Sequence, residues 1–366
     1  MNTSATITDS KNIKVSIKYG LSILFNKLGY YGFRSIFIFF MIGETMNLSR
    51  AEAYEIYGSF TVGIFASQLI GGFLGDILIG NKKAIILGGL LQVIGISLLC
   101  LNSITSLYLG LLLFCIGNGL YLPNFYSNYS KSFLDNSKFM DSAFLGIAIV
   151  TNIGAFLGVF IIGSIADSYG HTVCFILSAL FILISILPIY KSKNSNKEPT
   201  NTTKGSLLKR VLIINALLIV SGLFWLSFEY SYYALENLRS AAVNIYDTQQ
   251  ITQIGTTFSN ILYVVAFIVF SFLIIKSKYK IWIGVIVLIL SLLLTIYTKS
   301  TSFSEFTSAQ AFISISFLFA LSEVLIVPIA KSLLTKYGQP KYYAILFGLV
   351  AIINLWVTKM SNLLFQ

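Results

Sequence analysis

Four ionisable side chains lie inside long apolar stretches of this sequence, where a buried charge is costly and usually functional. Lys27 and Arg34 share the first stretch, Glu229 lies in the seventh, and Glu323 lies in the tenth. If the two cations and the two carboxylates meet in one cavity, they neutralise one another, and a zwitterionic solute or a proton can break the pairs. This pattern predicts a site for an amphoteric solute. The alternative is a static buried salt bridge that only holds two bundles in register.

Aromatic and amide side chains occur at a similar depth in the apolar stretches. Singly, each is typical of helix packing, but together they suit a site that hydrogen-bonds amides and chain termini. The expected substrate-binding residues are Lys27, Tyr30, Tyr31, Arg34, Asn152, Trp225, Glu229, Asn260 and Glu323. Glu229 and Glu323 are the candidates for proton coupling. The sequence shows no nucleophile–base pair, phosphate loop or metal-ligand spacing, so we expect no enzyme, no catalytic residue and no metal site.

The composition excludes an ordinary soluble protein. Of the 366 residues, 56% are hydrophobic and only 11% are charged, and the mean hydropathy is +0.82. Soluble domains carry about 25% charged residues. A helix needs about 20 apolar residues to cross a bilayer. Runs of this kind are predicted at 15–42, 54–78, 83–101, 105–128, 141–165, 171–190, 208–234, 250–275, 281–298, 307–334 and 342–363. The sequence therefore predicts an all-α polytopic membrane protein, with the lipid bilayer as its surroundings.

Basic residues precede the first apolar run and then follow every second run, which is the distribution that orients membrane proteins. The expected cytoplasmic set is Lys11, Lys14, Lys18, Lys82, Lys83, Lys131, Lys138, Lys191, Lys193, Lys197, Lys204, Lys209, Arg210, Lys276, Lys278, Lys280, Lys331, Lys336 and Lys341. The opposite side has Arg50, Arg239 and Lys299. We therefore expect a multi-pass protein of the plasma (cytoplasmic) membrane with a cytoplasmic N-terminus. The net charge of +11 forms no single basic stripe, so no nucleic acid is expected as a partner.

One long polar segment, KSKNSNKEPTNTTKG from Lys191 to Gly205, divides the chain. Its composition is typical of a flexible linker. The predicted domains are a six-helix N-terminal bundle at 1–190, a cytoplasmic linker at 191–206, and an incomplete five-helix C-terminal bundle at 207–366. Six plus six helices is the plan of the major facilitator fold. The last predicted run ends close to Gln366, so a twelfth helix is expected to be missing.

A second group of residues ends the run at 54–78 and forms a predicted gating or structural motif. Its members are Gly72, Gly75, Asp76, Gly80, Lys82 and Lys83. Glycines allow helices to approach closely. A carboxylate is favoured at the positive N-terminal end of a helix. We therefore expect Asp76 to bond the N-terminus of a neighbouring helix, in preference to an ordinary tight loop.

Several strings resemble signatures of known transporters. GGFLGDILIGNKK resembles the helix 2–3 signature of the major facilitator superfamily. NKLGYYGFRSIFIFFM resembles ExxERFxYYGxR, the first-helix motif of the proton-dependent oligopeptide transporter family. GNGLYLPNFYSNYSKSF, TNIGAFLG, FWLSFEY and LSEVLIVPIAKSLLTKYGQPKYYAILFG are similar, in the right order, to that family's segments in helices 4, 5, 7 and 10–11. The helix 4 resemblance adds Pro123 and Asn124 to the motif residues.

The resemblance implies an alternating-access transporter of di- or tripeptides, driven by a proton gradient and without a cofactor. Basic residues of the first half would face the peptide carboxylate, and Glu323 would face its amino group. Lys27 stands where the family has arginine, while Ile23 and Asn26 replace both first-helix glutamates and Leu122 replaces a helix 4 lysine. Two alternatives remain open. One is a facilitator or exporter of another small solute on the same fold, and the other is a truncated, non-transporting copy.

Overall fold

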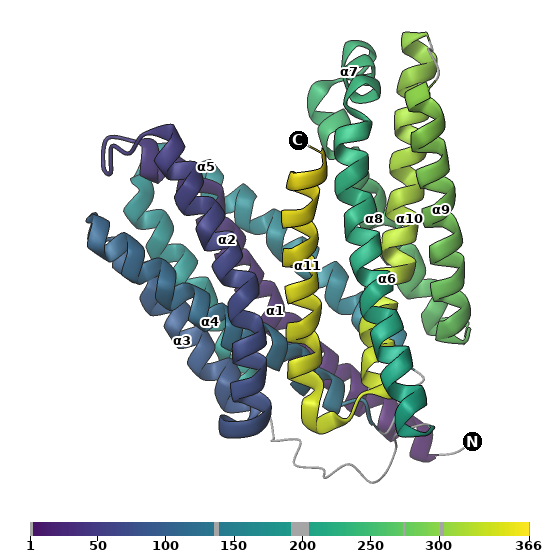
Figure 1. Cartoon of the computed structure of the whole chain (residues 1–366). Coiled ribbons are helices and arrows are strands. Elements are labelled where there is room, and N and C mark those ends of the chain that lie inside the picture. Colours follow the sequence, from purple (N-terminus) through teal and green to yellow (C-terminus); the bar gives the residue numbers. More distant parts are fainter. Residues whose placement is uncertain (1–2, 135–138, 192–204, 274, 301–303, 366) are drawn as a thin grey trace. The chain divides into compact units, whose positions relative to one another are not determined.

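The computed structural model describes residues 3–134, 139–191, 205–273, 275–300 and 304–365 of the chain. All regular structure in these ranges is helical (Figure 1). The elements are α1 (Thr3–Ile42), α2 (Arg50–Phe73), the π-helix η1 (Leu74–Ile79), α3 (Asn81–Leu99), α4 (Ile104–Lys131), α5 (Met140–Tyr190), α6 (Leu207–Ala234), α7 (Glu236–Ile245), α8 (Thr248–Phe272), α9 (Ser277–Ser300), α10 (Glu305–Tyr337), the 3₁₀ turn η3 (Pro340–Tyr342) and α11 (Tyr343–Phe365).

The predicted membrane-spanning runs return as helices, with two differences. In the described ranges, nine helices are long and apolar enough to cross a bilayer. The α5 helix of 51 residues contains two of the predicted runs, 141–165 and 171–190, and its backbone breaks at Gly170, where φ is 74°. The α1 helix is not among the nine, although it contains the predicted run at 15–42. Lys27 and Arg34 interrupt that run with charge.

The chain divides into two compact units that do not follow the predicted domain limits throughout. Unit 1 comprises residues 1–137, 150–203 and 338–352, and unit 2 comprises residues 138–149, 204–337 and 353–366. The α5 and α11 helices therefore each contribute one part to each unit. Residues 192–204 of the predicted linker lie outside the described residues.

Aromatic rings form the core of unit 1. Phe33 of α1 lies 5.8 Å from Phe60 of α2 and 5.5 Å from Phe114 of α4, measured between ring centroids. Beside this cluster, α3 and α4 approach closely enough to need residues without side chains. A Cβ atom at Gly95 would lie 2.6 Å from the carbonyl oxygen of Gly110, and a Cβ at Gly110 would lie 2.6 Å from the carbonyl oxygen of Gly95. Small residues that bring helix backbones together are typical of packing in membranes.

Unit 2 is built around α10, which packs against α6, α7, α8 and α9 (Figure 1). Its core contains Phe224 of α6, Leu288 of α9, and Phe312 and Phe319 of α10. The short α7 was not predicted, because its ten residues include several charged and polar ones and no apolar run. Two of its residues, Leu238 and Ala242, are nevertheless buried and join this core. A narrow apolar face is thus enough to hold a short helix against a larger bundle.

The α3–α4 contact gives the first prediction. We expect Gly95→Ala to lower the thermal unfolding midpoint in detergent, because the added methyl group meets backbone atoms that cannot move aside. Overpacking of this kind costs about 1–3 kcal/mol. Gly163→Ala in α5 is the matched control, since a Cβ there meets nothing within 4 Å. Equal midpoints for the two variants would contradict the close approach of α3 and α4.

Candidate functional site

The predicted residues of the first helix form one basic and aromatic group in unit 1. Lys27 is buried, and its Nζ lies 5.3 Å from the ring centroid of Tyr30 and 6.0 Å from that of Tyr31. Residues 27, 30, 31 and 34 share a helix face because they are three or four positions apart, about one helical turn. The electron-rich face of a tyrosine ring attracts an ammonium group. The two aromatic rings therefore help to hold the Lys27 ammonium group in place.

Arg34 is held by phenol groups. Its Nε donates to the hydroxyl of Tyr57 at 2.7 Å, and its Nη1 donates to the hydroxyl of Tyr30 at 3.0 Å. The guanidinium carbon also lies 5.0 Å from the ring centroid of Tyr57. Within the described part of unit 1, no carboxylate forms an ion pair with Arg34. The guanidinium is thus oriented by neutral acceptors and keeps its full charge for an anion.

The helix 10 acid, Glu323, lies in unit 2 and is held by hydroxyl groups of α8. Ser259 Oγ donates to Oε2 at 2.7 Å, and the Tyr263 hydroxyl donates to Oε1 at 3.1 Å. Each carboxylate oxygen has its own donor, so the group is fixed in direction. Ser259 is buried, whereas the predicted neighbour Asn260 is exposed. The hydroxyl donors, like Tyr57, were missed by the sequence reasoning, because only the fold brings them to a charge.

The helix 7 residues lie on α6. Trp225 packs edge-on against Phe224 and Phe228, with ring centroids 5.3 and 5.9 Å apart. Glu229 is half-buried one turn further along, and it has no hydrogen-bonded or ionic partner in the described part of unit 2. Asn152 is half-buried on the part of α5 that belongs to unit 1. The structure thus brings the first-helix residues together in unit 1, whereas the two acids lie in unit 2 on different helices, each in its own surroundings.

The glycine and aspartate motif closes one end of unit 1. The Asp76 carboxylate accepts from the backbone N–H of Ile345 at 3.0 Å and from Asn81 Nδ2 at 2.9 Å, and it lies 3.8 Å from Lys131 Nζ. Because Ile345 lies in the first turn of α11, the predicted contact of Asp76 with a helix N-terminus is confirmed. The remaining basic residues of the motif, Lys82 and Lys83, are half-buried and exposed respectively.

Glycine and asparagine residues shape this end of unit 1. A Cβ atom at Gly75 would lie 1.7 Å from Asn124 Oδ1, and one at Gly72 would lie 2.4 Å from the carbonyl oxygen of Ala344. Asn124, one residue after the buried Pro123, donates from Nδ2 to the carbonyl oxygens of Gly71 and Leu120 at 2.8 Å. Asp76 itself lies in a π-helix that ends at Gly80, where φ is 81°. Turns of π-helix are frequent at functional sites.

A second buried carboxylate, Asp141, was not predicted. It lies at the start of α5, within unit 2, and forms ion pairs with Lys280 at 2.7 Å and Lys336 at 2.6 Å. Ser277 Oγ donates to it at 2.8 Å and Ser332 Oγ at 2.5 Å. The sequence analysis counted both lysines only as part of the orientation signal. Lys280, whose side chain is only 4% exposed, also neutralises a buried carboxylate.

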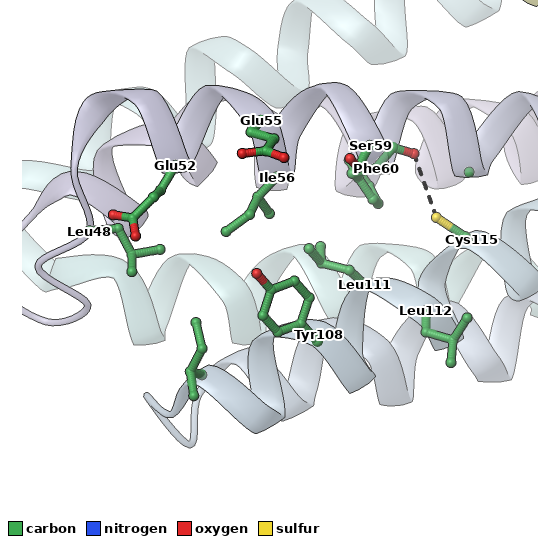
Figure 2. A pocket seen from close by; sticks show the side chains of 12 residues that line it. Leu48, Glu52, Glu55, Ile56, Ser59, Phe60, Tyr108, Leu111, Leu112 and Cys115 are labelled. Carbon is green, nitrogen blue, oxygen red and sulfur yellow. Dashed lines mark hydrogen bonds between the residues drawn. The ribbon is translucent and has the colours of Figure 1, made fainter.

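A cavity of about 790 Å³ lies between the first turns of α2 and α4. Figure 2 shows the side chains that line it. Glu52, Glu55 and Ser59 line its α2 side, and Tyr108 lines its α4 side. The Cys115 thiol donates to the carbonyl oxygen of Phe60 at its inner end. Among the described residues that line this cavity, none belongs to the predicted site. The candidate site therefore rests on the two charge groups above.

Comparison with known proteins identifies the class. A family model described as Major Facilitator Superfamily matches residues 20–359, so the chain belongs to this superfamily. Solved structures agree with the fold. A peptide transporter POT in complex with sulfate has a TM-score of 0.59 at 18% identity and covers 96% of this chain and 90% of its own. The human organic anion transporter MFSD10 has a TM-score of 0.69 at 13% identity, with 96% and 92% covered.

Curated relatives match part of the chain. Dipeptide and tripeptide permease A of Chromobacterium violaceum is 31% identical over 162 residues, which are 44% of this chain and 32% of that permease. The permease A of Escherichia coli (strain K12) is 31% identical over 166 residues, which are 45% and 33%. The matched segments span about a third of these relatives' length. The predicted resemblance to the oligopeptide transporter family is confirmed.

The Asp141 cluster gives the second prediction. We expect Asp141→Asn to lower the thermal unfolding midpoint strongly, because Lys280 and Lys336 lose their buried counter-charge. Breaking a buried ion pair on one side costs about 3–5 kcal/mol. Asp167→Asn, at an exposed position of α5, is the matched control. The triple variant D141L/K280M/K336M should regain much of the loss, since it leaves no unpaired charge. A D141N variant as stable as the wild type would contradict the cluster.

Proposed function

We propose that this protein is a secondary transporter that moves di- and tripeptides by alternating access and couples their entry to protons. The carrying observation is that Arg34 is oriented by two tyrosine hydroxyls, which are neutral and leave its charge for an anion. Lys27 lies beside it against the rings of Tyr30 and Tyr31. Glu323, fixed by two hydroxyls, offers the opposite charge. The curated relatives, named dipeptide and tripeptide permeases, and the peptide transporter structures support this substrate class.

In this proposal, each end of the peptide binds to a residue of opposite charge. Arg34 and Lys27 bind the terminal carboxylate, because a guanidinium presents parallel N–H donors to its two oxygens. Glu323 binds the terminal ammonium group. Asn152 and Asn260 hydrogen-bond the peptide backbone, and Trp225, Tyr30 and Tyr31 supply apolar walls. The chain performs no chemistry on the peptide and needs no cofactor, since the proton gradient supplies the energy.

Proton coupling requires a group that changes its charge during the cycle. Glu229 and Glu323 are the candidates, because the first-helix acids of the family are replaced by Ile23 and Asn26. We propose that Glu229 pairs with Arg34 or Lys27 in the empty transporter, and that a proton or the substrate breaks this pair. The protein lies in the cytoplasmic membrane with a cytoplasmic N-terminus, as its basic residues favour.

Uptake by proteoliposomes tests the function. We expect saturable uptake of a radiolabelled dipeptide that rises several-fold under an inward proton gradient. Equal rates with and without the gradient would show that coupling is absent. Failure of every dipeptide and tripeptide to enter or to compete, together with uptake of another metabolite from a panel, would favour the alternative facilitator or exporter. No uptake of any solute would favour the non-transporting copy.

The third prediction concerns the geometry at Arg34. Arg34→Lys keeps the positive charge but loses the planar guanidinium group. That group donates to Tyr57 and Tyr30 and still has N–H groups left for an anion, which a single ammonium group cannot do in the same geometry. We expect KM for dipeptide to rise about tenfold, which corresponds to about 1.4 kcal/mol. Arg50→Lys, at an exposed position at the start of α2, should leave uptake unchanged. If both variants behave like the wild type, Arg34 does not contact the substrate.

A further inference from the structure

Three buried carboxamide side chains lie in the core of unit 1, and none of them is assigned to the peptide. Asn26 of α1 and Gln92 of α3 are 0% exposed, and Asn118 of α4 is 1% exposed. Asn26 Nδ2 donates to Gln92 Oε1 at 3.2 Å. Three atoms of this group have no hydrogen-bond partner among the described residues: Asn26 Oδ1, Gln92 Nε2 and Asn118 Oδ1. Unpartnered buried atoms are rare in folded proteins and call for an explanation.

Contacts on either side place Asn118 opposite Asn26. One turn before Asn26, Ser22 Oγ lies 2.7 Å from the hydroxyl of Tyr121. One turn after it, the ring of Tyr30 stacks on Phe114 with centroids 5.7 Å apart. The residue numbers rise along α1 as they fall along α4, so the two helices are antiparallel. Because residues three or four apart share a helix face, Asn118 lies between Tyr121 and Phe114 on the face that meets α1.

Gln92 reaches the same place from α3. A Cβ atom at Gly117, the residue before Asn118, would lie 2.7 Å from the backbone nitrogen of Gln92 and 3.0 Å from its Cγ. The α3 backbone therefore touches α4 beside Asn118, and the Gln92 side chain crosses from there to Asn26. Three helices thus bring three amides to one level of the bundle.

Exchanging the nitrogen and oxygen positions of the Asn26 and Gln92 amide groups does not give every polar atom a hydrogen-bond partner. The pair of Asn26 and Gln92 uses one donor and one acceptor for its shared bond, in either orientation of both groups. It then leaves one nitrogen and one oxygen without a partner, the same number as before. A molecule that both donates and accepts is needed to complete the group.

We propose that the core of unit 1 binds one water molecule between Asn26, Gln92 and Asn118. The water donates its two hydrogens to Asn26 Oδ1 and Asn118 Oδ1 and accepts one hydrogen bond from Gln92 Nε2. Three hydrogen bonds are typical of a buried water. In this proposal the water lies between the larger pairs on either side, Tyr121 with Ser22 and Tyr30 with Phe114, which set the spacing of α1 and α4.

A metal cation fits this group less well than water. Gln92 Nε2 turns hydrogens, not a lone pair, toward the site. Lys27 adds a positive charge on α1 directly after Asn26. The water links three helices at the residue before Lys27 and so fixes the rotation of α1 there. This inference does not depend on transport, and it remains testable if the proposed function fails.

Solid-state NMR of the full chain in bilayers, with ¹⁵N-labelled asparagine and glutamine, tests the site. Magnetisation transferred from water protons should reach the Gln92 side-chain amide nearly as fast as it reaches Asn102, which is exposed. Asn124 is the matched control, since it is 0% exposed and its Nδ2 already donates to two carbonyl oxygens. Transfer to Gln92 as slow as transfer to Asn124 would overturn the proposal. The signal of the Gln92 side-chain amide is assigned by its loss in the variant Gln92→Met.

Two variants place the water at Asn118. Asn118→Leu fills the gap with methyl groups, so transfer to Gln92 should fall to the level of Asn124. Asn118→Ser keeps a hydroxyl and the space, so transfer should persist. Unchanged transfer in the leucine variant would show that the water lies elsewhere. A thermal unfolding midpoint that rises in sodium chloride, but not in choline chloride at equal ionic strength, would instead assign the site to a cation. If the leucine variant does not fold, the wild-type comparison with Asn124 still decides.

Discussion

Lipid offers no hydrogen bonds, so every polar group inside these helical bundles must find its partner within the protein. The two buried aspartates meet this requirement in the same way. Asp76 takes backbone and side-chain donors around the start of α11, and Asp141 takes two lysines and two serines. Both join the ends of several helices within one unit. Removing the Asp141 carboxylate leaves two lysines without their buried counter-charge.

The residues assigned to the peptide satisfy the same requirement in a different way. Arg34 donates to two tyrosine hydroxyls, and Glu323 accepts from a serine and a tyrosine. Neutral hydroxyls and ring faces fix the direction of a charge without cancelling it. An ion that already has its counter-ion, such as Asp141, gains little from another. A charge oriented by neutral groups still gains from a ligand of opposite sign, and this difference separates a structural charge from a binding one.

Much of the fold follows from local patterns in the sequence. Apolar runs separated by basic or polar segments predicted the helices, and the spacing of Lys27, Tyr30 and Arg34 placed them on one helix face. The partners of those charges could not be predicted, because Tyr57, Ser259 and Tyr263 lie on other helices and no local pattern marks them. The short α7 was missed for a related reason, since its stability comes from two buried residues in a polar segment.

Two lysines of α9 show what the local sequence pattern does not predict. A lysine at the end of an apolar run is counted as an orientation signal, and Lys278, exposed at the start of α9, fits that interpretation. Lys280, two residues further on, lies on another face of the same helix and is buried against Asp141. Two positions along a helix turn a side chain by more than half a circle, since each residue rotates by about 100°. The packing of the helix, and not the sequence around the charge, therefore decides whether a cation faces lipid headgroups or holds a carboxylate inside the protein.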